Sequence, residues 1–277
     1  MAHSIVPAAE AILDKEFTVL NKGFVRLVDY MGGDERIVQS ARVSYGSGTK
    51  TVREDKGLIN YLMKNLHTSP FEQVSLTFHA KMPIFVARQW IRHRTARLNE
   101  ISGRYSVMPD EFYLPAPEDI RYQSQNNKQG RGEEVSPELQ AKVIEILKKD
   151  QISVYANYEA MIKDDVAREL ARINLPLSLF TQWYWQIDLH NLFHFLRLRM
   201  DDHAQKEIRV YGEVMAMMAK AVAPMAYEAF EEHILHGTRL SRTETAAVRE
   251  ILAGRENPLK GKELEEFKRK ILSREGR

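Results

Sequence analysis

The clearest pattern in the chain is an alternation of apolar and polar residues that runs from Gln73 to Met82. Because successive side chains of a strand point to opposite faces of a sheet, this alternation predicts a half-buried β-strand. Pro83 follows and suits the first turn of a helix, and the mostly apolar segment 84–91 predicts that helix. The apolar face of the predicted strand consists of Val74, Leu76, Phe78, Ala80 and Met82.

Other patterns predict further helices and strands along the chain. Asp34 is a good N-cap for a helix through about Ser44. Ser136 and Pro137 open a long helix that we expect to run to about Arg172. An excess of Gln, Asn, Lys and Gly predicts an exposed loop at 123–135. The remaining predicted elements are strands at 24–28, 105–113 and 180–187, and helices at 54–66 and over most of 190–209.

A dense group of charges follows the predicted helix at 84–91. Residues 92–105 hold four arginines, a histidine, an asparagine and a glutamate. Because Arg stays charged and is rarely buried without a partner, this segment cannot belong to the core. It is either a solvated basic turn or an anionic-ligand site, in which guanidinium groups grip a phosphate. The predicted regular elements on both sides favour the ligand site.

Composition narrows the class of protein. The chain has 277 residues, of which 44% are hydrophobic and 28% charged, as in ordinary globular proteins. The net charge of +2 is too small to indicate nucleic-acid binding through bulk charge. The absence of cysteine excludes disulfides, thiolate metal sites and a Cys nucleophile. Charged residues interrupt the only apolar stretch near the N-terminus, and no run is long enough for a membrane span, so we expect a cytoplasmic protein.

Two histidines in the predicted helix at 190–209 allow more than one interpretation. His190 and His194 lie one turn apart, a spacing known from zinc hydrolases, but Asn191 stands where the zinc signature has its Glu. At about 100° per residue, Arg199 points roughly opposite to His190, with His203 beside Arg199. The helix is either simply buried on its apolar side, with polar flanks, or shared between sites or subunits.

Residues 92–104 resemble the signature RHRxxSxNxxSxR of the flavin-dependent thymidylate synthases. The matching positions are Arg92, His93, Arg94, Asn99, Ser102 and Arg104. Arg97 stands where the pattern has Ser, and we expect a tolerated departure whose side chain points to solvent or to a ligand phosphate. The resemblance covers roughly 24–233 and includes a second region at 168–209.

This resemblance implies an α+β fold, with a mostly antiparallel central sheet flanked by long helices and assembled as a homotetramer with sites shared between subunits. It implies reductive methylation of dUMP to dTMP with FAD as cofactor, methylenetetrahydrofolate as one-carbon donor and NADPH as reductant. The missing cysteine agrees, because methylation at C5 of uracil often proceeds through addition of a Cys thiolate. It implies no metal, nucleic-acid or membrane partner.

The resemblance also assigns residues. Arg199 is implied as the catalytic residue, which stabilises negative charge on the uracil ring. Ser44 either faces the pocket or hydrogen-bonds its own backbone. The implied substrate-binding residues are Gln89, Trp90, Ile91, Arg92, Glu100, Ile101, Ser102, Gly103, Arg104, Arg172 and Arg199. The implied cofactor-binding residues are Ser69, Arg92, His93, Arg94, Glu100, Asp188, Leu189, His190 and His194.

The sequence also predicts one domain boundary and leaves two rival functions open. Residues 1–237 are expected to form the catalytic domain, and residues 238–277 a charged appendage that is peripheral or partly disordered. The main rival function is a nucleic-acid-binding module that uses the basic stretch 92–104 and the aromatic strand. The second rival is a His/Asp metal hydrolase.

Overall fold

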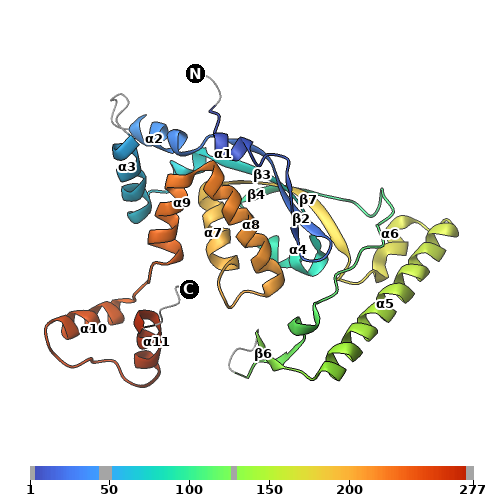
Figure 1. The fold of residues 1–277 in the computed structure, drawn as a ribbon. Coiled ribbons are helices and arrows are strands. Elements are labelled where there is room, and N and C mark those ends of the chain that lie inside the picture. The colour runs from blue at the N-terminus through green and yellow to red at the C-terminus, as the bar shows by residue number, and fades with distance from the viewer. Residues whose placement is uncertain (1–3, 44–51, 126–129, 273–277) are drawn as a thin grey trace.

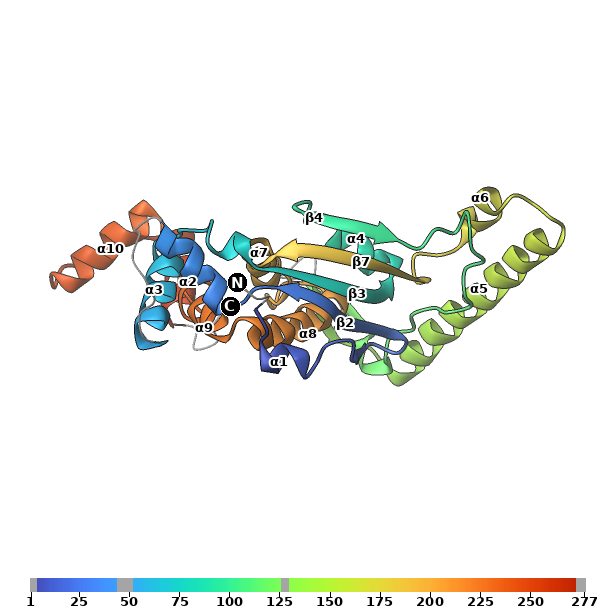
Figure 2. The same cartoon turned by 90° about the horizontal axis from the view of Figure 1, so that it is seen from above.

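The computed structural model describes residues 4–43, 52–125 and 130–272, so that Ser44 lies outside the described residues. Its centre is a five-stranded sheet with the order β1-β2-β3-β7-β4, in which every pair of neighbours is antiparallel (Figures 1 and 2). The predicted α+β class with an antiparallel sheet is confirmed. The strands are β1 (Glu16–Val19), β2 (Gly23–Met31), β3 (Ser75–Pro83), β4 (Ala96–Glu100) and β7 (Phe180–Asp188).

Strand β3 occupies the middle of the sheet, as its sequence pattern predicts. The five apolar side chains on one face are fully buried, and the polar side chains between them are only half-buried. The register places Phe78 opposite Leu27 of β2 and Trp185 of β7, so that large apolar groups line up across three strands. This buried apolar face is the surface against which helices of the protein pack.

The helices that follow β3 and β7 cover the buried face of the sheet. Figure 1 shows α7 (Leu189–Arg199), α8 (Lys206–Val222) and α9 (Pro224–Phe230) side by side in front of the strands. Helix α4 (Ile84–Trp90) brings the Trp90 ring within 5.2–5.8 Å, between centroids, of four aromatic rings, and Trp90 is 0% exposed. Those four rings belong to Trp183, Trp185, Phe195 and Tyr211.

Asp34 caps helix α9, whereas the sequence predicted that it caps the helix that follows Asp34 itself. It begins α2 (Asp34–Val43), yet its carboxylate accepts hydrogen bonds from the backbone N–H groups of Met225 and Ala226, at 2.8 and 2.9 Å. These groups belong to the first turn of α9, where the unpaired N–H groups of a helix favour an anion. Burial raises the pKa of Asp34, and the two backbone hydrogen bonds oppose that rise.

Several predicted boundaries are wrong. The helix from Pro137 ends at Lys163 rather than near Arg172, because Asp165 adopts a left-handed conformation with φ of +57°. Residues 105–113 form turns and one isolated bridge instead of a strand. The region 123–135 is not only a loop, because its two ends belong to a hairpin. Between residues 117 and 174 the structure contains β5 (Arg121–Gln123), β6 (Arg131–Glu134), α5 (Pro137–Lys163), α6 (Arg168–Ala171) and the 3-10 turns Pro117–Asp119 and Arg172–Asn174.

The predicted helix over 190–209 is two helices. Helix α7 stops at Arg199 and α8 starts at Lys206, so that His203 lies in the connection and not beside Arg199 on one straight helix. The Asp201 carboxylate accepts from the backbone N–H and the ring of His203, at 2.9 and 2.8 Å, and stabilises this turn.

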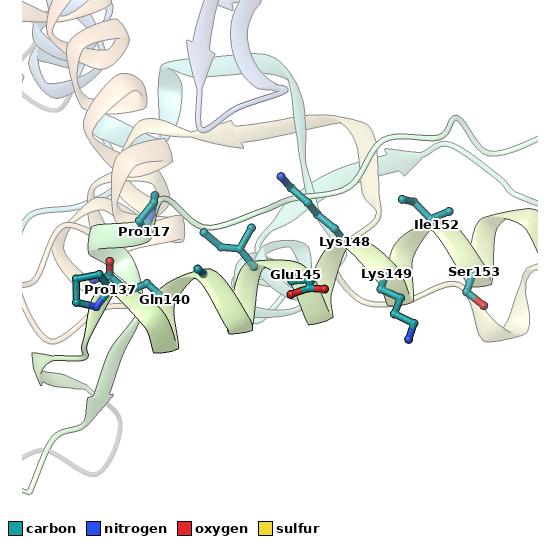
Figure 3. Close-up of a pocket in the computed structure, with 10 residues that line it drawn as sticks. Pro117, Pro137, Gln140, Glu145, Lys148, Lys149, Ile152 and Ser153 are labelled. Atoms are coloured by element: carbon teal, nitrogen blue, oxygen red, sulfur yellow. The ribbon is translucent and has the colours of Figure 1, made fainter.

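Helix α5 extends away from the body of the molecule (Figure 1). An open groove of about 840 Å³ runs along one side of α5, and Figure 3 shows Pro117 next to Pro137 and Gln140 at one end and Ile152 and Ser153 at the other. No helix among the described residues is both long and apolar enough to cross a lipid bilayer.

The described part of the C-terminal segment, residues 238–272, is folded, whereas the sequence led us to expect a peripheral or partly disordered appendage. It forms two helices with a small core of their own around Ala247, Leu259 and Phe267, below α9 in Figure 1. The remaining elements are α1 (Pro7–Glu10), α3 (Val52–Lys64), the 3-10 turn Phe71–Gln73, the π-helical turn Glu231–Leu235, α10 (Arg242–Leu252) and α11 (Gly261–Leu272).

Candidate active site

The end of α4 and the end of α7 meet at the start of the basic segment. The Arg199 guanidinium donates to Nε2 of His93 at 3.2 Å and to the backbone carbonyl of Gln89 at 3.0 Å. The amide side chain of Gln89 donates to Gln205, at the start of α8, at 2.5 Å. Arg199 is thus held by two acceptors and half-buried. Burial, with a further contribution from Arg92, lowers the pKa of Arg199, but an arginine remains charged at neutral pH.

His93 completes this arrangement as a neutral acceptor. Its ring packs edge-on against Phe195, with 4.9 Å between centroids, and lies 5.7 Å from the ring of His194. Burial, followed by the charges of Arg199 and His194, lowers the pKa of His93 to about 4. At neutral pH the ring therefore has a free lone pair, which is what a hydrogen bond from the Arg199 guanidinium requires.

We expect the stability of the protein to fall between pH 6.5 and about 4 partly because of His93. In this window the unfolded chain, with a usual pKa of 6.5, binds a proton that the folded chain excludes, so stability decreases as pH falls. His93→Gln keeps an acceptor for Arg199 and should flatten the decrease of the urea midpoint between pH 7 and pH 5. His236→Gln, at an exposed histidine, should keep the wild-type slope. Equal slopes in all three proteins would contradict this assignment.

A pocket of about 320 Å³ is lined by His194, whose ring lies 5.7 Å from the ring of His93. Its apolar floor includes Phe71 and Phe193, and its polar wall carries His67, His190 and His194. Burial lowers the pKa of His194, and the charges of Arg197, His190 and Arg199 lower it further. The complete lining is Leu62, Met63, Leu66, His67, Thr68, Phe71, His190, Phe193, His194, Arg197, Ile234 and Arg239.

A chain of hydrogen bonds ties the basic segment to the start of α7. The Asp188 carboxylate caps α7 by accepting from the backbone N–H of Asn191 at 2.9 Å and from its side-chain amide at 2.7 Å. Asn191 in turn accepts from the hydroxyl of Thr95 at 2.8 Å. Asp188 therefore orients the helix that carries His190 and His194. Ser69, another implied cofactor residue, is exposed next to Thr68 at the rim of the pocket.

A second group of predicted residues lies beyond the far end of β4. Glu100 accepts from the hydroxyl of Thr181 at 2.5 Å, and the Ser102 hydroxyl accepts from the backbone N–H of Arg104 at 3.3 Å. Gly103 is buried against Arg172, because a Cβ at Gly103 would lie 3.0 Å from Cδ of Arg172. Arg104 forms an exposed ion pair with Glu169 at 3.2 Å, which contributes little to stability.

The chain does not bring its two groups of site residues together. Gln89, Arg92 and His93 precede β4 in the chain, and Arg199 contacts Gln89 and His93. Ser102, Gly103 and Arg104 follow β4, and Arg172 packs against Gly103. A strand of five residues such as β4 spans about 17 Å. The position of this strand was not predicted, since the segment was expected to be a loop. Arg97, on β4, is exposed and donates to Gln186 at 3.2 Å.

Two of the predicted residues are buried in the core. Trp90 and Leu189 are each 0% exposed, so their side chains do not face a pocket or the solvent. In contrast, the exposed residues Arg92 and Arg94 form no ion pair with any described residue. Ile91 is 43% exposed, and Ile101 packs with the small cluster around Tyr158.

Two arginines of the pocket, Arg197 and Arg239, were not predicted from the sequence. Arg197 lies three residues after His194 and seven after His190, so a comparison of helix faces would have grouped all three. Arg239 carries no such signal, because it reaches the pocket from a segment far along the chain. Among the described residues, no three His, Cys, Asp or Glu side chains converge as a metal site.

Comparison with known proteins agrees with the sequence signature. Residues 26–225 match the family profile described as "Thymidylate synthase complementing protein", and residues 238–276 match the profile "Thymidylate synthase ThyX C-terminal domain". A flavin-dependent thymidylate synthase of Treponema denticola is 65% identical over 94% of this chain and 98% of its own length. One from Treponema pallidum is 57% identical over 99% of this chain and 90% of its own length.

A solved structure adds the fold. The UMP/dUMP methylase PolB from Streptomyces cacaoi, bound with 5-Br dUMP, is 30% identical and matches with a TM-score of 0.71 over 78% of this chain and 97% of its own. These matches favour an enzyme over the nucleic-acid-binding module that the basic stretch allowed. On the strength of the signature at 92–104 and of these relatives, the chain belongs to the flavin-dependent thymidylate synthase family.

Proposed function

We propose that the enzyme methylates dUMP reductively to dTMP, with FAD as cofactor, methylenetetrahydrofolate as one-carbon donor and NADPH as reductant. The observation that carries the proposal is the position of Arg199, which donates to His93 and to the Gln89 carbonyl, while the His93 ring lies 5.7 Å from His194 of a pocket with an apolar lining. The structural relative, a UMP/dUMP methylase bound with 5-Br dUMP, supports the choice of nucleotide.

The pocket suits part of a flavin. Phe71 and Phe193 provide an apolar surface for a flat ring, while His190, His194 and Thr68 provide polar groups at its edges. Arg92 and Arg94, which are exposed and unpaired within the described chain, are available for a pyrophosphate. When bound, the reduced flavin supplies a hydride.

Arg199 acts on the uracil ring in this proposal. The ring must become nucleophilic at C5 without a thiol, since the chain has no cysteine. A guanidinium at the N3 and carbonyl edge stabilises the negative charge that develops on the ring, and it cannot serve as a base because it stays protonated. Gln89 accepts from Arg199 through its backbone carbonyl, and its side-chain amide, which donates to Gln205, is assigned to the uracil edge.

The nucleotide phosphate is assigned to the group of residues beyond β4. Ser102, Arg104 and Arg172 offer a hydroxyl and two guanidinium groups, and the missing Cβ of Gly103 lets the Arg172 side chain pack directly against this segment. Because these residues and Arg199 lie at opposite ends of β4, a complete site requires residues from two copies of the chain. This supports the homotetramer that the family resemblance implies.

An absorption spectrum of the purified protein tests the cofactor. The protein should carry or take up FAD, and with dUMP, methylenetetrahydrofolate and NADPH it should form dTMP. A protein that stays colourless, quenches no FAD fluorescence in a titration and forms no dTMP would contradict the proposed function.

Mixing two inactive variants tests the shared site. Arg199→Ala and Arg104→Ala each remove one half of the proposed site, so each variant alone should be nearly inactive. After unfolding and reassembly as a mixture, sites that draw one intact half from each chain should recover about a quarter of wild-type activity on random pairing. Reassembly of each variant alone is the control. If the mixture recovers no activity although mixed oligomers form, both halves belong to one chain.

A further inference from the structure

The start of the C-terminal segment reaches the pocket beside α7. The chain leaves α9, passes the turn Glu231–Leu235 and places Arg239 on the pocket wall, before α10 begins. A smaller adjoining hollow of about 190 Å³ is lined by the same Arg197, Ile234 and Arg239. Arg239 lies beyond the family profile that ends at residue 225 and within the one that starts at 238.

The two arginines of the pocket lack partners. Within the described part of the chain, neither Arg197 nor Arg239 forms an ion pair or a side-chain hydrogen bond. Elsewhere the arginines next to cavities are paired, as Arg131 is with Asp119 and Glu207. Asp201 lines the smaller hollow, but its carboxylate accepts from the backbone N–H and the ring of His203.

Two unpaired guanidinium groups on one pocket favour an anion. Like charges that share a partly enclosed space repel each other, and an anionic group between them removes this cost. The guanidinium fork matches the oxygen geometry of phosphates and carboxylates. The charge of Arg197 acts on the pocket, because after burial it is the largest influence that lowers the pKa of His194.

We infer that Arg239 is a ligand-binding residue of this enzyme and that, with Arg197, it holds an anionic group of a molecule bound against His190 and His194. The group is a phosphate or a carboxylate, and FAD, NADPH and the folate all carry one. The inference rests on the proposed function, which assigns the flavin to this pocket and names NADPH and the folate as co-substrates. It gives the C-terminal segment a direct part in ligand binding, in place of a purely peripheral role.

The test compares full-length Arg239→Gln with Arg242→Gln. Arg242 is an exposed arginine three residues further on, in the first turn of α10, and it lines no cavity described above. Three quantities are measured at low and high salt: the Kd of the apoprotein for FAD by fluorescence quenching, the KM for NADPH in flavin reduction, and the KM for the folate in dTMP formation. Thermal unfolding of each variant verifies the fold.

Arg239→Gln should raise at least one of these constants about tenfold or more and reduce its dependence on salt. The constant that rises identifies which molecule supplies the anion. Arg239→Lys keeps the charge without the fork and should fall between wild type and Arg239→Gln. If Arg239→Gln matches Arg242→Gln in all three constants, the inference is wrong while the proposed function stands. A wild type that binds no FAD and forms no dTMP contradicts the proposed function instead.

Discussion

Arg199→Ala should lower the rate of dTMP formation about a hundred- to a thousandfold at saturating dUMP, the usual cost of removing one preorganised donor to developing charge. The effect should appear in turnover, because the uracil ring is neutral in the ground state and gains charge only toward the transition state. The His93 ring and the Gln89 carbonyl fix Arg199 in advance, so the wild-type enzyme does not have to reorganise it during the reaction.

Flavin reduction separates this role from a structural one. Reduction by NADPH needs no charge on the uracil ring, so Arg199→Ala should retain it. Arg199→Lys keeps the charge but loses the planar fork that bonds both acceptors, and it should also form dTMP slowly. The two half-reactions are measured separately on the same preparations. Wild-type rates of dTMP formation in Arg199→Ala would disprove the assignment, and loss of both half-reactions would indicate that Arg199 supports the fold or the subunit interface.

Trp90→Ala should destabilise the protein by about 3–5 kcal/mol, as for other large core aromatic residues. The indole lies at the centre of the aromatic cluster that joins α4, β7, α7 and α8, so its removal leaves a cavity where four elements meet. A typical domain is stable by only about 5–15 kcal/mol. This is a large loss for a residue that the family resemblance assigned to substrate binding.

Two variants control for this interpretation. Trp90→Phe fills most of the space and also removes an indole N–H that has no hydrogen-bond partner within the described chain, so it should cost less than half as much. Tyr105→Ala, at a side chain that is 78% exposed, should change stability by no more than about 0.5 kcal/mol. Urea denaturation measures the free energy of unfolding of all three variants. A cost below about 1 kcal/mol for Trp90→Ala would show that the indole does not support the core.

Local patterns were sufficient to predict the elements that a single buried face defines. The alternation at 73–82 gave β3, and Ser136 with Pro137 gave the start of α5, where the Ser136 hydroxyl accepts from the backbone N–H of Leu139. The end of α5 was missed, because no Gly or Pro marks it and the left-handed Asp165 is visible only in the structure.

Contacts between distant segments account for the other errors. Residues 96–100 belong to a polar segment that looks like a loop, but they become a strand because β7 offers its free edge to them. Asp34 was predicted to cap its own helix, yet it caps one that begins 190 residues later at Pro224. Arg197 and Arg239 meet at one pocket although nothing in their sequence neighbourhoods links them. The signature at 92–104 identified the family, but it did not show that the site residues form two groups at opposite ends of β4.

The place of β7 between β3 and β4 sets the order in which a newly made chain can fold. Among the described strands, β4 pairs only with β7, and β7 ends at Asp188. At a synthesis rate of roughly 5–20 residues per second, β7 leaves the ribosome several seconds after β4. During that interval β4 has no partner strand among the described elements, and the charges of its segment oppose pairing with another chain. A site that uses the residues on both sides of β4 therefore forms only after β7 has joined the sheet.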